Sequence, residues 1–79
     1  MSNSKKKSSQ TYEKLVPISK AENLRVGVNE KDRTIILDFG FFKNDNTVCI
    51  DVSKEIPEHI AHKLVQSLTE ALSELPLNE

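Results

Sequence analysis

Cysteine is almost absent from this sequence: Cys49 is the only one among 79 residues. A single thiol cannot form an internal disulfide, whereas secreted domains of this size are normally held together by several. The scarcity indicates a reducing compartment, and we expect the protein to be cytoplasmic. Long apolar runs are also lacking, since none approaches the ~20 residues that cross a membrane. No apolar stretch follows the lysines of residues 1–10, as it would in a signal peptide.

Recognisable catalytic and metal-binding motifs are equally absent. His59 and His62 lie three residues apart in a predicted helix, but no third ligand has a spacing that would complete a zinc site. The loop around Asp45 lacks the glycine and the terminal glutamate of a calcium site. Cys49 lies in mid-strand between two aliphatic residues, without the cationic neighbour or helix N-terminus that activates a thiol. We therefore expect a non-enzymatic protein that uses no cofactor or metal.

Charge is distributed unevenly: residues 1–20 carry a net charge of +4 and residues 21–79 one of −5. Residues 1–10 are rich in serine and lysine and are predicted to be disordered, because they have too little apolar surface to offset their ordering entropy. Within them, Lys5, Lys6 and Lys7 are candidate contacts to nucleic-acid phosphates. The acidic remainder of the chain repels nucleic acid. We therefore favour a solubilising tail, with nucleic-acid binding as the alternative function.

Residues 11–22 form a second segment of different composition, which is apolar at Tyr12, Leu15, Val16 and Ile18. Pro17 removes a backbone donor and so limits any strand here to a sheet edge. We expect an extended segment that either adds a short edge strand or packs on a partner. The remaining residues, 23–79, are predicted to form a single α+β domain.

Apolar and polar residues alternate along residues 23–29, 34–42 and 47–53, which is the period of half-buried strands. The charged loop 30–33 and the Asn/Asp-rich turn 43–46 are short enough to join them as two hairpins. The result is a three-stranded antiparallel meander.

A helix is predicted after the strands. Pro57 is pre-organised for a first helical position. From there, apolar residues recur at three- and four-residue spacing as far as Leu75, just before Pro76. We therefore predict a C-terminal amphipathic helix from Pro57 to Leu75 and a βββα order. One face of the predicted sheet is almost wholly apolar, and we expect the helix to pack on it and cover it.

The other, outer face of the predicted sheet is mixed. Asp38 and Asp51 share it, and paired carboxylates can act as acid and base. No pocket or nucleophile accompanies them, and Arg25 on the same face offers a cross-strand ion pair instead. The salt bridge is therefore the interpretation that we favour.

Three apolar side chains are left on the outer face, namely Ile36, Phe42 and Cys49. An exposed apolar cluster usually marks an interface. Together with Tyr12 and Val16, the three are the candidate contacts to a partner. The alternative is that residues 12–18 of the same chain cover these three outer-face side chains.

Residues 37–40 read Leu-Asp-Phe-Gly, and the predicted strand 48–52 and the apolar helix 60–72 follow them. In this the chain resembles a family of small uncharacterised bacterial proteins, in which a strand with this tetrapeptide precedes another strand and an apolar helix. The resemblance implies the same strand–strand–strand–helix order and brings no activity with it.

The size of the domain bears on its assembly. Domains this small rarely gain more than ~3–5 kcal/mol from one core, and a three-stranded sheet leaves two exposed edges. We therefore expect a homodimer, formed by edge pairing, by helix packing or by cover of the outer apolar residues. The predicted function is protein binding, as a small regulator, adaptor or inhibitor of the kind that bacteria and phages encode. Strand addition at a sheet edge is the expected mode of recognition.

Overall fold

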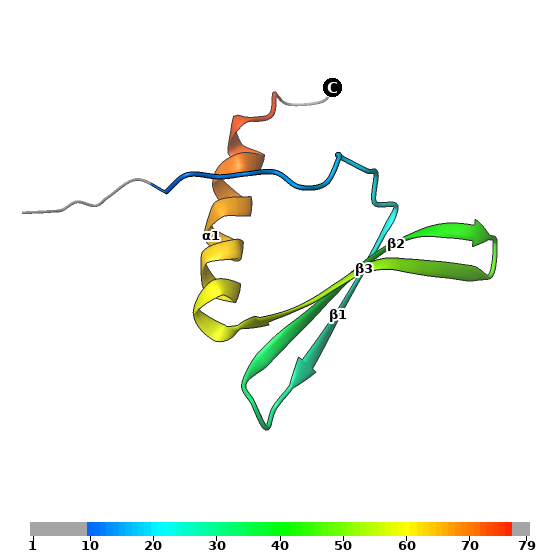
Figure 1. Ribbon diagram of the computed structural model, residues 1–79, viewed down its shortest axis with the longest axis horizontal. Helices are drawn as coiled ribbons and strands as arrows, with labels where there is room; N and C mark the ends of the chain where they lie inside the picture. Colours follow the sequence, from blue (N-terminus) through cyan, green and yellow to red (C-terminus); the bar gives the residue numbers. More distant parts are fainter. Residues whose placement is uncertain (1–9, 77–79) are drawn as a thin grey trace, which may run out of the picture.

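The computed structural model describes residues 10–76 and contains a three-stranded antiparallel sheet followed by one helix (Figure 1). The strands are β1 (Asn23–Asn29), β2 (Thr34–Asn44) and β3 (Thr47–Pro57), and the helix is α1 (Glu58–Glu74). β2 lies in the centre, with β1 and β3 at the edges. The predicted βββα order and α+β class are confirmed. The candidate nucleic-acid contacts Lys5, Lys6 and Lys7 lie outside the described residues.

β2 and β3 are longer than predicted, with 11 residues each. β1 pairs with β2 only from Thr34 to Gly40. The rest of the β2–β3 hairpin therefore projects beyond β1 as a two-stranded ribbon (Figure 1). We call residues 40–50 the hairpin end. An isolated two-stranded hairpin is marginally stable in water, so the hairpin end depends on further contacts.

A β-bulge in β3 changes which side chains share a face. Gly40 pairs with Ile50 although the preceding residue of β2 pairs with Val52, so that Asp51 is an extra residue in β3. The two strands approach closely at this point. A Cβ atom on Gly40 would overlap the backbone carbonyl of Cys49, which is why a glycine stands here.

The prediction that Cys49 lies on the outer face is wrong. Beyond the bulge, Cys49 pairs with Phe41 and Val48 pairs with Phe42, and directly paired residues point to the same face. Cys49 therefore lies on the inner face, toward α1, while Val48 and Ile50 move to the outer face. The alternation of apolar residues predicted the reverse because it assumes an unbroken ladder.

α1 packs on the sheet only through its first turns. Ala61 and Leu64 are half-buried, whereas the later apolar residues Val65, Leu68 and Leu72 are 53–65% exposed. The expectation that the apolar stripe covers the inner face is therefore met at one end of the sheet only. Among the described residues, no helix is long and apolar enough to cross a membrane.

The chain passes from β3 into α1 at Pro57. This proline is the last residue of β3 and the N-cap of α1, with extended backbone angles, rather than the first helical residue as predicted. No loop separates the strand from the helix. α1 therefore leaves the sheet in a direction that the end of β3 sets (Figure 1).

Residues 10–22, which we call the arm, are extended and form no strand. The side chains of Tyr12, Leu15, Val16 and Ile18 are 66–88% exposed. The arm therefore adds no edge strand to its own sheet. Residues 12–18 also do not cover the outer face, where Phe42 remains 51% exposed.

The described residues contain no buried hydrophobic side chain. The accessible surface is 7230 Å², whereas a compact monomer of this mass exposes about 4,800 Å². The protomer thus forms its secondary structure without enclosing a core.

Candidate binding interface

A broad apolar surface extends from the inner face of the sheet to the free part of α1. We call it the inner apolar surface, and its exposed members are Leu24, Val26, Val28, Phe41, Val52, Val65, Leu68 and Leu72. Their exposed fractions run from 39% to 66%. Soluble monomers rarely expose a contiguous apolar patch of more than a few hundred Å². The inner apolar surface is therefore a candidate interface with another chain.

A second apolar group lies on the outer face of the hairpin end. Phe42 pairs with Val48, and Ile50 lies opposite Gly40. We call Phe42, Val48 and Ile50 the outer cluster; Phe42 and Ile50 are 51% and 37% exposed. The inner face carries Phe41 and Cys49 at the same place, so the hairpin end is apolar on both sides. Other residues therefore have to cover the apolar side chains on both faces of the hairpin end to remove them from water.

The structure does not bring the predicted interface residues together into one patch. Ile36 and Phe42 share the outer face but are six residues apart along β2, about 20 Å at ~3.3 Å per residue. Asp38 lies between them. Tyr12 and Val16 lie on the arm, where they are 83% and 66% exposed. Phe42 alone of these residues belongs to the outer cluster.

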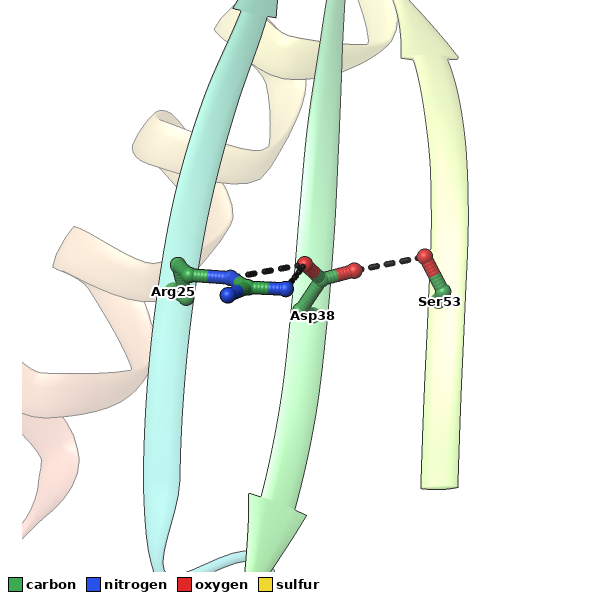
Figure 2. A network of polar contacts seen from close by, with 3 residues as sticks. All are labelled: Arg25, Asp38 and Ser53. Atoms are coloured by element: carbon green, nitrogen blue, oxygen red, sulfur yellow. Dashed lines mark hydrogen bonds and ion pairs between the residues drawn. The ribbon is translucent and has the colours of Figure 1, made fainter. Parts of the chain in front are cut away.

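A row of polar side chains crosses all three strands between Ile36 and the outer cluster (Figure 2). Nε and Nη2 of Arg25 donate to Oδ2 of Asp38 at 3.1 and 2.9 Å. Oγ of Ser53 donates to Oδ1 of Asp38 at 2.5 Å. The predicted salt bridge between Arg25 and Asp38 is thus confirmed. Asp51 lies at the bulge instead, so the two carboxylates do not form a pair.

The environment of Asp38 favours its charged form. Asp38 is only 8% exposed, and the hydrogen bonds from Ser53 and then Arg25 lower the pKa of its carboxyl group below the usual value. A carboxylate held ionised in this way is a weak general base at neutral pH. Its role is structural, because a slip of one residue in either strand pair would separate the three side chains.

A smaller polar group lies where α1 begins. Nη2 of Arg33 is 2.8 Å from Oε1 of Glu58, and Nε2 of His62 is 3.7 Å from Oε2 of Glu58. The hydrogen bond from Arg33 lowers the pKa of Glu58. These side chains line an open hollow beside Val28 and Ala61. Within residues 10–76, no three His, Cys, Asp or Glu side chains are grouped closely enough to hold a metal ion.

The strand pattern did not predict Val48 and Ile50 in the outer cluster. The available signal was Gly40, because an isolated glycine within a strand pattern often marks a bulge or a close backbone approach. Placing a bulge beside Gly40 moves Ile50, Cys49 and Val48 to the faces opposite those predicted.

Comparisons with protein-family models, with curated proteins and with solved structures find no match for this chain. The resemblance that residues 37–40 suggest stays a prediction. What the interface does therefore has to be inferred from its own residues.

Proposed function

We propose that this protein is a small, cytoplasmic, non-enzymatic protein-binding module that is complete only as a homodimer. The supporting observation is the absence of any buried hydrophobic side chain among residues 10–76. Burial of apolar surface is the main force that stabilises folded domains. A chain that encloses no apolar side chains needs them to be covered by another chain. Obligate homodimers often have no stable folded monomer for this reason.

The exposed area matches what a stable dimer requires. The protomer exposes 7230 Å², roughly 2,400 Å² more than a compact monomer of its mass. The extended arm contributes part of this excess, so about 4,800 Å² is the most that two copies would bury in covering it, and obligate homodimers bury areas up to this size. A standard transient interface of about 1,600 Å² would leave most of it exposed.

A second copy is the simplest partner for the inner apolar surface. Two-fold dimers use one self-complementary surface on both subunits. The inner apolar surface is of this kind because it combines an uncovered sheet face with an unpacked helix. In a pair, each copy can cover the exposed sheet face and the exposed helix residues of the other.

The outer cluster is where we expect a different protein to bind. It lies on the face opposite the inner apolar surface, so it stays accessible when the homodimer forms. Aromatic residues are enriched in protein interfaces, and Phe42 is the exposed aromatic side chain of this cluster. The homodimer would present two such clusters.

Light scattering and sedimentation equilibrium test the homodimer. The expected mass is about 17.8 kDa, twice the 8.9 kDa of the chain. The thermal unfolding midpoint should rise with protein concentration, because association and folding are coupled. A mass of 8.9 kDa at micromolar concentration, with cooperative unfolding that does not depend on concentration, would refute the homodimer.

Affinity purification from the native cells tests the outer cluster. The tagged wild type is compared with Phe42→Ser and with Lys43→Ser, a change at the next, exposed residue. Light scattering first establishes that both variants remain dimers. We expect a protein that is recovered with the wild type and Lys43→Ser but lost with Phe42→Ser. Equal recovery with all three would remove the outer cluster from the proposal.

A further inference from the structure

The arm is fixed at its root and unpacked along its length. The N–H of Glu22 donates to the carbonyl oxygen of Gly40 at 2.8 Å, and Oε1 of Glu22 accepts a hydrogen bond from the N–H of Phe42 at 2.9 Å. Before this anchor, Leu15 and Ile18 are 88% and 83% exposed. Ten extended residues reach up to about 33 Å. The arm can therefore carry apolar side chains well beyond its own sheet.

The arm is poorly suited to pairing with a sheet edge. Pro17 has no N–H to give to a ladder. The apolar alternation is also broken, because Lys14 interrupts the face that positions 12, 16 and 18 share and Leu15 lies on the opposite face. A segment of this kind can instead lie along a helix, where side chains make the contacts and no backbone ladder is needed.

α1 presents a matching unoccupied strip. Val65, Leu68 and Leu72 are three and four residues apart and so lie on one side of the helix. They are 53–65% exposed, and we call them the free flank of α1. The helix has 17 residues, a length of about 25 Å. The arm is long enough to run along all of it.

Charge favours the same pairing. The end of α1 carries Glu70 and Glu74, with no basic residue in its last turn, and the C-terminal end of a helix dipole is itself negative. Residues 11–20 of the arm carry Lys14 and Lys20 against Glu13, while the second acidic residue of the arm, Glu22, is at the anchor beside Phe42. Within the described residues, neither these lysines nor the two glutamates at the helix end form an ion pair. The arm thus offers the cations that the helix end lacks.

We propose that the arms are exchanged in the dimer, so that residues 11–20 of each copy lie along the free flank of α1 in the second copy. This inference rests on the proposed homodimer. The occupant is a second copy of the chain because each protomer offers both an anchored arm and an uncovered flank. A two-fold exchange covers both arms and both flanks at once.

Cross-linking between chains tests the exchange. In a Cys49→Ser background, a tagged chain carries Ser19→Cys in the arm and an untagged chain carries Thr69→Cys beside the free flank. The two chains are refolded together and treated with a short bismaleimide. We expect a tagged–untagged product near twice the chain mass of 8.9 kDa on a denaturing gel. A control pair replaces Ser19→Cys by Lys31→Cys, in the turn between β1 and β2, and should give no such product.

The outcomes separate the exchange from the homodimer on which it rests. Dimers by light scattering without a cross-chain product would overturn the exchange and leave the homodimer standing. A chain that carries both Ser19→Cys and Thr69→Cys adds a second check. If it links only within itself, the arm lies on its own helix and the exchange is wrong. Monomers by light scattering would remove both proposals.

Discussion

Leu72→Gln tests the inner apolar surface by changing a side chain that the single protomer leaves in water. Leu72 is 65% exposed. Glutamine has nearly the helix propensity of leucine, so the substitution preserves α1. In a monomer, the change would have little effect on stability. In a two-fold dimer that buries Leu72, the change acts in both copies.

The exposed fraction sets the size of the effect. Fully burying a leucine side chain contributes about 1.5–3 kcal/mol. Because 65% of Leu72 remains to be buried, the dimer would lose about 1–2 kcal/mol per copy, or about 2–4 kcal/mol in all. Each 1.4 kcal/mol is about a factor of ten in affinity. The dissociation constant of the dimer should therefore rise by about 30- to 700-fold.

Sedimentation equilibrium over a series of protein concentrations measures this constant. Lys63→Gln is the matched control, because it places the same side chain on the opposite, exposed side of α1. It should leave the dissociation constant unchanged. If Leu72→Gln also dissociates like the wild type, the dimer does not bury the helix stripe and the argument from exposed area fails.

Two further substitutions probe the sheet itself, with urea unfolding at fixed protein concentration as the measurement. Gly40→Ala should destabilise the protein by about 1–3 kcal/mol, since its Cβ meets the backbone of Cys49. Gly27→Ala is the control, because a Cβ at this position would have Ile36 Cβ as its nearest neighbour at 3.8 Å. It should be neutral or stabilising by up to about 1 kcal/mol. Equal losses of stability in the two variants would contradict the close approach of the strands at the bulge. Asp38→Asn should lower the free energy of unfolding at pH 7, and it should lower this free energy by less at pH 3. The lowered pKa of Asp38 stabilises the folded chain above the usual value of 3.8, and this contribution disappears as pH falls through the folded-state pKa. A loss of stability that is equal at pH 7 and pH 3 would contradict the role given to the hydrogen bonds of Asp38.

The features that could be predicted from the sequence depend on neighbours along the chain. Alternating residues placed β1 at its observed bounds, and the spacing of apolar residues placed α1 to within one residue at each end. The short charged and Asn/Asp-rich loops predicted the order of the strands in the sheet. Arg25 and Asp38 were predicted to pair because both are on the same face of adjacent strands.

The features that could not be predicted depend on contacts between distant residues. The bulge arises where the backbones at Gly40 and Cys49 approach each other, and these residues belong to different strands. The direction of α1 depends on the chain path at Pro57. An apolar stripe indicates that a surface will be covered, but it does not indicate which chain covers it. This is why the uncovered inner face was not foreseen.

The bulge at Asp51 also determines which edge of the sheet can accept another strand. A regular edge presents evenly spaced backbone donors and acceptors that a second chain can match, and fibrils grow from such edges. The ladder of β3 is interrupted at Asp51, which adds a negative charge there, whereas all seven residues of β1 pair without a shift. We therefore expect any added strand to pair with β1. By the same reasoning, the interrupted edge of β3 is the less favourable of the two edges for stacking of copies into fibrils.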